Sequence, residues 1–173
     1  MSDPTWTVTE AEFDPTRLLP QETVFTLGNG YLGTRGSSGE RCPGDRPATL
    51  IHGVYDDLPI AYTEPANCPN WLPMYVSVEG ERFRLDRGDI LRYERRLDLR
   101  HGLLCRDVRW RSPSGYSVDT RFERFASPAD QHVLPVRFQV IPIESACTIR
   151  AQAGIDGCPD NLGITHREWL DQG

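Results

Sequence analysis

The stretch LPMYVSVEGERFRLD, residues 72–86, alternates apolar and polar side chains on both sides of a central Glu-Gly pair. Apolar residues occupy every second position before and after Glu79-Gly80, namely Met74, Val76 and Val78, then Phe83 and Leu85. An alternation of period two that is interrupted by a glycine turn indicates two paired strands with one buried face. The stretch therefore predicts antiparallel β-structure.

The same pattern continues toward the C-terminus. Alternating runs follow one another, separated by the turn sequences RHG, SPSG and SPAD, at residues 91–99, 104–110, 116–122, 134–140 and 147–151. Short strands with a turn signal every 8–12 residues are typical of sandwiches and barrels. The 173 residues fit one domain of ordinary size. We therefore predict a single all-β domain over residues 1–173, an antiparallel sandwich.

Toward the N-terminus, the glycine-rich stretch LGNGYLGTRG, residues 27–36, contains the spacing G-x-G-x-x-G. A dinucleotide-binding loop would need a helix directly after these glycines, but the following residues are rich in glycine and proline. We predict a hairpin instead, with Asn29-Gly30 at its tip and residues 24–27 as its first strand. Helical turns are expected only at residues 14–22, where Asp14 precedes Pro15, and at residues 165–173.

Composition excludes several classes of protein. The formal charge of −6 argues against a nucleic-acid-binding protein, which needs a basic face. No window approaches the ~20 apolar residues of a membrane span, and the N-terminus lacks the features of a signal peptide. The five scattered cysteines form no C-x-x-C pair, so we expect reduced thiols, a cytoplasmic protein, and no metal or other cofactor.

All nineteen basic residues are arginine. We interpret this mainly as a compositional bias, although arginine also binds carboxylate and phosphate groups with two hydrogen bonds. The twenty-five acidic residues provide many carboxylate pairs by chance. We therefore assign no catalytic residue.

Four residues are candidates for a carbohydrate or domain-interface site. Trp71 lies between two prolines, which stiffen the chain, and Asn70 precedes it. Its indole is placed either to stack on a sugar ring or to fill one end of the sandwich core, the commoner role of an aromatic side chain. Tyr31 and Arg35 belong to the glycine hairpin. Arg35 has the chemistry to bind an anion or to pair with an acid across a domain surface.

Several segments together resemble the N-terminal domain of glycoside hydrolase family 65, which contains maltose, trehalose and kojibiose phosphorylases and related hydrolases. They follow in the same order as in that family, at residues 22–36 (ETVFTLGNGYLGTRG), 52–56, 67–83 (NCPNWLPMYVSVEGERF), 97–104, 121–134 and 154–166. One departure is that the family commonly has two acids shortly after the RG pair, where this chain has only Glu40.

The resemblance implies a β-super-sandwich that precedes an (α/α)₆ catalytic barrel. The catalytic glutamate and the phosphate site of that family lie in the barrel, which has no counterpart in these 173 residues. We thus expect a truncated chain, a short gene product or a minimal standalone domain, with an incomplete sandwich.

Three hypotheses of function follow from the resemblance. In the first, the domain is non-catalytic, supports the barrel and promotes homo-oligomerisation, and its partner is an α-glucosidic disaccharide bound through the catalytic domain. In the second, it is a standalone carbohydrate-binding module. In the third, which the absence of catalytic motifs disfavours, it is a small enzyme of its own.

Overall fold

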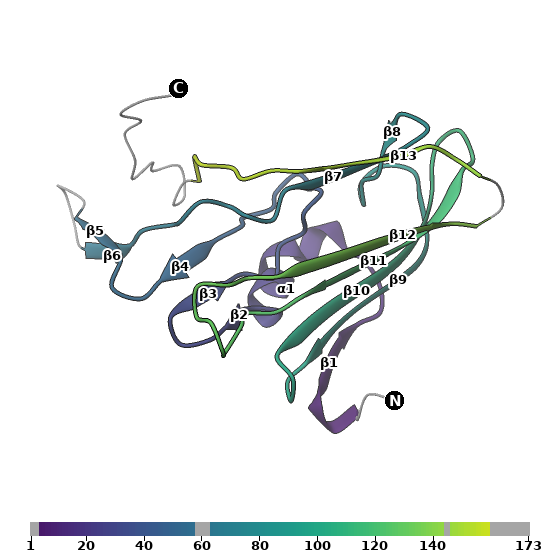
Figure 1. Ribbon diagram of the computed structural model, residues 1–173. Helices are drawn as coiled ribbons and strands as arrows, with labels where there is room; N and C mark the ends of the chain where they lie inside the picture. Colours follow the sequence, from purple (N-terminus) through teal and green to yellow (C-terminus); the bar gives the residue numbers. More distant parts are fainter. Residues whose placement is uncertain (1–3, 58–62, 144–145, 160–173) are drawn as a thin grey trace.

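The structure is a computed structural model that describes residues 4–57, 63–143 and 146–159, and these residues form an all-β fold of antiparallel sheets with one short α-helix (Figure 1). In chain order the elements are η1 (Pro4–Trp6), β1 (Thr7–Glu10), η2 (Pro15–Arg17), α1 (Leu18–Val24), β2 (Leu27–Gly28), β3 (Leu32–Thr34), β4 (Thr49–Ile51), β5 (Tyr55–Asp57), β6 (Thr63–Pro65), β7 (Met74–Val78), β8 (Glu81–Arg82), β9 (Asp89–Asp98), β10 (Leu103–Arg111), β11 (Ser117–Arg124), β12 (Val136–Pro142) and β13 (Ile149–Ala153). The predicted helix at residues 165–173 lies outside the described residues.

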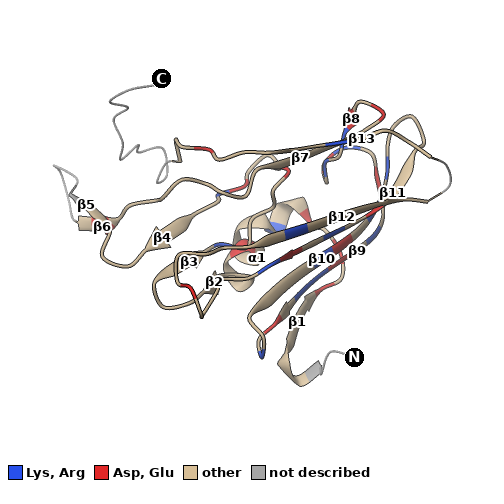
Figure 2. Ribbon diagram, in the orientation of Figure 1, with Lys and Arg blue, Asp and Glu red and all other residues tan. Residues whose placement is uncertain are grey.

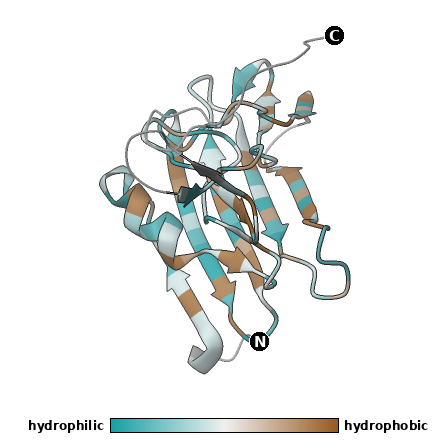
Figure 3. Cartoon of the chain, turned by 90° about the vertical axis from the view of Figure 1, so that its left-hand side faces the viewer, coloured by the Kyte–Doolittle hydropathy of each residue, from teal (hydrophilic) through white to brown (hydrophobic). Residues whose placement is uncertain are grey.

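The large sheet has five strands in the order β1-β9-β10-β11-β12. Each strand pairs antiparallel with its neighbour, and β9, β10 and β11 follow one another along the chain as a meander. Apolar and polar bands alternate along these strands (Figure 3), as expected for a sheet with one buried face. The antiparallel prediction from the period-two pattern is confirmed.

A three-stranded sheet in the order β13-β7-β8 faces the large sheet (Figure 1). The hydrophobic core lies between the two sheets, where Val78, Val108 and Trp110 are fully buried. The β7–β8 turn has Glu79 at φ 48° and Gly80 at φ 82°. Two successive positive φ values are typical of a tight hairpin turn, so the hairpin predicted from residues 72–86 is confirmed.

The smaller sheets are β2-β3-β4 and β5-β6. At the glycine hairpin, Gly30 has φ 91°, and the Asn29 side-chain oxygen accepts hydrogen bonds from the amides of Tyr31 and Leu32 at 3.1 and 3.0 Å. The predicted hairpin tip is confirmed.

The helical segment is longer than the sequence indicated. Asp14 caps η2 by accepting a hydrogen bond from Thr16 N at 2.8 Å, as expected, but the chain then continues through α1 to Val24. Pro20 is tolerated because it lies in the first turn of α1, where a helix needs no N–H. The expectation of a strand over residues 24–27 was therefore wrong except at Leu27. Within the described residues, no helix has the length and apolar character needed to span a membrane.

Candidate functional site

The tip of the glycine hairpin is tied to the loop between β11 and β12. The side-chain nitrogen of Asn29 donates hydrogen bonds to Ser127 O at 2.8 Å and to Gln131 O at 3.1 Å. The Tyr31 ring lies edge-on to the His132 ring, with 4.7 Å between their centroids. Tyr31 is therefore partly buried against this loop, which limits the face that it presents to a ligand or a partner.

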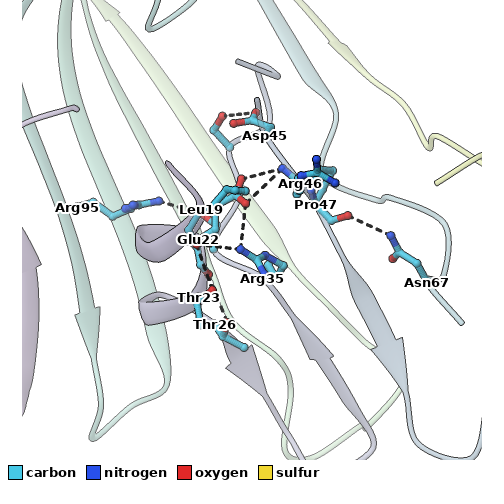
Figure 4. A network of polar contacts seen from close by, with 12 residues as sticks. Leu19, Glu22, Thr23, Thr26, Arg35, Asp45, Arg46, Pro47, Asn67 and Arg95 are labelled. Atoms are coloured by element: carbon cyan, nitrogen blue, oxygen red, sulfur yellow. Dashed lines mark hydrogen bonds and ion pairs between the residues drawn. The ribbon is translucent and has the colours of Figure 1, made fainter. Parts of the chain in front are cut away.

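Arg35 belongs to a polar network that includes residues of α1 (Figure 4). Its guanidinium lies 3.4 Å from the carboxylate of Glu22, which is 1% exposed, and it donates a hydrogen bond to Leu19 O at 2.9 Å. The backbone N–H of Arg46 approaches the same carboxylate at 3.3 Å. The acid that pairs with Arg35 thus belongs to this domain. The pair fixes α1 to the start of the glycine-rich loop, residues 35–48, which connects β3 to β4.

Arg35 and Asn70 line one open cleft of about 850 Å³. Asn70 forms an antiparallel bridge with Asp156, through two backbone hydrogen bonds of 2.8 Å. Arg41 reaches Asp156 through its side chain, with 2.7 Å between the charged atoms. The cleft is therefore polar and carries both signs of charge.

The other two predicted site residues do not line this cleft. Trp71 is partly buried, and within the described part of the chain its indole N–H is enclosed without a hydrogen-bond partner. Tyr31 packs on His132 as described above. Arg35 and Asn70 therefore line one cleft, whereas Tyr31 and Trp71 do not belong to its lining, and the role of all four stays a prediction.

A second charged cluster, which the sequence analysis missed, lies on the inner face of the large sheet. Its members are the buried charged side chains of β1, the glycine-rich loop and the sheet strands, namely Glu10, Glu40, Arg95 and Arg106, with Arg124 at the end of β11. Charged residues recur along β9, β10 and β11 (Figure 2), and some of them point inward. The burial of these two arginines could have been predicted from their place in the alternation. Arg95 and Arg106 each lie two residues after a buried apolar residue of the same strand, Tyr93 and Leu104, and therefore point to the same face of the sheet.

The two acids of this cluster neutralise two of the arginines. Arg95 Nε lies 2.8 Å from Glu10 Oε2, which also accepts a hydrogen bond from the Tyr93 hydroxyl at 2.9 Å. Glu40, fully buried, forms an ion pair with Arg106. Each carboxylate is thus engaged by a guanidinium, which favours a structural role over general acid–base chemistry.

Asp45 is the acid whose ionisation is most perturbed toward neutral pH among those described. Burial, together with the nearby charges of Glu22 and Glu40, raises the pKa of Asp45 to about 6, although Cys42 N donates a hydrogen bond to its carboxylate at 2.6 Å. A raised carboxyl pKa in a cleft is typical of functional sites. Here the Asp45 carboxylate closes the turn 42–45, which also explains its position. Burial raises the pKa of the Cys42 thiol to about 12, so this thiol is not a nucleophile at neutral pH.

The arrangement offers little direct chemistry. Within residues 4–57, 63–143 and 146–159, no group of three or more His, Cys, Asp and Glu side chains is placed to hold a metal ion. Glycoside hydrolysis needs two carboxyl groups on either side of an open substrate site. The acids Glu10, Glu22 and Glu40 are buried and committed to arginines, so they do not provide such a pair.

Comparison with known proteins identifies the family of this chain. Residues 8–172 match the profile of the glycosyl hydrolase family 65, N-terminal domain. The chain is 33% identical to a kojibiose phosphorylase of Halothermothrix orenii over 93% of this chain and 21% of the relative. It is 33% identical to a nigerose phosphorylase of Lachnoclostridium phytofermentans over 96% of this chain and 22% of the relative.

A solved structure gives the same result. A protein from the human microbiome, assigned as a kojibiose phosphorylase, superposes with a TM-score of 0.69 and 25% identity, over 81% of this chain and 20% of that one. The chain thus spans about a fifth of the length of the relatives that it matches. Because the profile covers residues 8–172 and the curated relatives match nearly all of the chain at more than 30% identity, this chain belongs to glycosyl hydrolase family 65 and contains its N-terminal domain.

Proposed function

We propose that this domain performs no catalysis itself and supports the catalytic domain of a family 65 enzyme that acts on an α-glucosidic disaccharide. The observation that carries the proposal is the extent of the match, since the chain corresponds to about a fifth of each relative, at its N-terminal domain. The relatives are phosphorylases of kojibiose and nigerose, which favours phosphorolysis as the activity of the whole enzyme. The paired state of the buried acids supports a non-catalytic role for this part.

We further propose that the domain associates with other protein through the edges of its two sheets. Among the described residues, β12 and β13 are edge strands of facing sheets, and an unpaired edge is a template for further strands. Large apolar side chains are exposed near these edges, among them Ile141 at 60% and Ile155 at 75%. Exposed apolar groups next to open edges are typical of an interface. The partner is the catalytic domain or a second copy of this chain.

A carbohydrate-binding module is the second candidate, and the polar cleft near Arg35 and Asn70 favours it. Sugar binding by a module relies on an exposed aromatic platform beside polar groups. Trp71 is the aromatic residue next to Asn70 in sequence, but it is partly buried and does not line the cleft. This separation makes the second candidate the weaker one.

The test measures sugar binding, enzymatic activity and self-association of the full chain. We expect no saturable heat on titration with trehalose, kojibiose, nigerose or maltose, and no phosphate-dependent turnover of any of them. Light scattering should show a dimer or larger species that Ile141→Glu dissociates, whereas Leu91→Glu, at an exposed position of β9, should not. Saturable sugar binding that Asn70→Ala abolishes, in a monomeric wild type, would establish the binding module instead.

A further inference from the structure

Three arginines on adjacent strands border a small cavity between the large sheet and the glycine-rich loop. Arg95 and Arg106 are directly opposite each other in the β9–β10 register, and Arg124 lies at the end of β11. Residues 36–39 close the cavity from the other side, and its volume is about 40 Å³. A single water needs roughly 10–15 Å³ on this measure. The cavity is thus large enough for a ligand of several heavy atoms.

The charges around this cavity do not balance. Arg95 and Arg106 have carboxylate partners in Glu10 and Glu40. For Arg124, in contrast, no carboxylate of the described residues lies within ion-pair distance, and its guanidinium donates a hydrogen bond to the carbonyl of Arg35 at 3.3 Å. Burial, together with the charges of Arg106 and Arg95, lowers the pKa of Arg124 to about 9, and the more distant charges of Glu40 and Glu22 oppose this shift only in part. Arg124 is partly buried, and removing a cation from water without an ion-pair partner is costly, so this site favours an anion.

The one acid that borders the cavity is already neutralised. Glu123 precedes Arg124 on β11 and lines the same cavity. The Glu123 carboxylate lies 2.9 Å from Arg121 and 3.4 Å from Arg137. It therefore belongs to a separate group of ion pairs and does not compensate Arg124.

Hydrogen-bond donors at the cavity also lack acceptors. Within the described residues, Ser37 Oγ, Arg106 Nε and Arg124 Nε are buried without a hydrogen-bond partner, and all three residues line the cavity. Ser37 is 2% exposed and Arg106 is 6% exposed. Each unmet buried donor costs free energy. An oxyanion, whose unprotonated oxygens accept hydrogen bonds, satisfies several such donors at once.

The loop that closes the cavity is held at both ends, so the site is preformed. Arg95 donates a hydrogen bond to Gly36 O at 2.8 Å, and Met74 N donates to Gly39 O at 3.1 Å. The two glycines pack too closely for any side chain, since a Cβ at Gly36 would lie 2.6 Å from Phe25 Cβ and one at Gly39 would lie 2.7 Å from Leu72 O. The loop is therefore fixed over the arginines.

We propose that this cavity binds a small inorganic oxyanion of phosphate or sulfate size, held by Arg106, Arg124 and the Ser37 hydroxyl. The anion provides the missing counter-charge and links the glycine-rich loop to the inner face of the large sheet. Its role is to stabilise the fold, and it takes part in no reaction. The proposal is independent of the enzyme's substrate.

The test is a titration of the full chain in a zwitterionic buffer of low ionic strength. Inorganic phosphate and sodium sulfate are added in separate arms, with sodium chloride at matched ionic strength as reference, and binding is followed by calorimetry and thermal unfolding. We expect saturable binding at one site and a rise in Tm above that in chloride, since a ligand of the folded state stabilises it. The two arms show which oxyanion fits better.

Arg124→Met is the decisive variant, and Arg150→Met, at an exposed position of β13, is its control. We expect Arg124→Met to weaken oxyanion binding by about tenfold or more, the effect of losing one charge-assisted hydrogen bond. Without oxyanion, Arg124→Met should unfold at the wild-type temperature or above it, because the uncompensated charge has been removed. Arg150→Met should bind as the wild type does.

Ser37→Ala provides a second measurement if Arg124→Met does not fold, and we expect several-fold weaker binding from it. Saturable binding that both variants weaken supports the proposal. Three outcomes would overturn it: no saturable binding, stabilisation by phosphate and sulfate no greater than by chloride, or equal stabilisation of the wild type and Arg124→Met.

Discussion

The large sheet and the glycine-rich segment of residues 25–48 pack against each other but bury different kinds of group. In the sheet, the fully buried side chains are apolar, such as Val108, Trp110 and Val118. In the segment, buried polar groups such as Glu40 and Ser37 lie beside Phe25. The sheet is therefore stabilised mainly by hydrophobic burial, whereas the segment depends on ion pairs and hydrogen bonds to that sheet.

This contrast determines how each region should respond to mutation. Removing volume from the sheet leaves a cavity. Removing one charge from the interface with the segment leaves its partner buried and unpaired, which is costly even though an apolar replacement of both partners is tolerated. The predictions below test the two regions with matched variants, in order of decreasing effect on the free energy of unfolding.

The largest loss is expected from Trp110→Ala in β10. Trp110 is fully buried, lies edge-on to Phe83 at 5.5 Å between ring centroids, and donates a hydrogen bond from its indole to Arg87 O. Large aromatic truncations in a core cost about 3–5 kcal/mol. Urea unfolding measures the change, and Trp6→Ala, at a side chain 47% exposed, should cost under about 1 kcal/mol. Equal effects of the two variants would contradict the assigned core.

Glu40→Gln tests the glycine-rich segment. The change leaves Arg106 buried without its carboxylate, and breaking a buried pair on one side costs about 3 kcal/mol. The double variant Glu40→Gln with Arg106→Met removes the stranded charge and should recover part of this loss. A double variant less stable than Glu40→Gln alone would show that Arg106 has other essential contacts.

The same contrast explains what could be predicted from the sequence. The hairpin at Glu79-Gly80 and the strands after it follow from local alternation and turn residues, which act within a few positions. The position of Arg106 on an inward face was also readable, but its partner Glu40 lies 66 residues away, and no local pattern indicates which acid reaches it. The extension of α1 to Val24 was missed because the partners of its buried Glu22, Arg35 and the backbone of Arg46, lie 13 and 24 residues further along the chain.

Asp45→Asn should change the pH dependence of stability. The pKa of Asp45 is raised from 3.8 to about 6 in the fold, so between these values the unfolded chain releases the proton while the folded chain keeps it. Wild-type stability from this group is thus full below pH 4, falls as pH rises toward 6, and stays low above it. Relative to the wild type, Asp45→Asn should gain up to about 3 kcal/mol between pH 4 and pH 7.

Urea unfolding at several pH values measures the difference in free energy of unfolding between Asp45→Asn and the wild type. The contributions of the other carboxylates cancel in this difference because both proteins contain them. Asp89→Asn, at an exposed position at the start of β9, removes a surface carboxylate and is the matched control. A flat difference for Asp45→Asn would mean that its carboxylate is solvated in the folded chain.

The smallest changes in stability are expected from alanine substitutions at two glycines of the same hairpin. Gly30 has φ 91°, and a Cβ there would meet no other atom within 4 Å, so Gly30→Ala is opposed by backbone conformation alone and should cost about 1 kcal/mol. Gly33 lies in β3 without a positive φ, and a Cβ there would meet Leu27 O at an ordinary 3.8 Å. Gly33→Ala should therefore be neutral or stabilise by up to about 1 kcal/mol, because alanine restricts the unfolded chain. Thermal unfolding of both variants checks this. If Gly33→Ala were the more damaging of the two, the glycine spacing would serve close approach of another group, and the hairpin turn would no longer account for it.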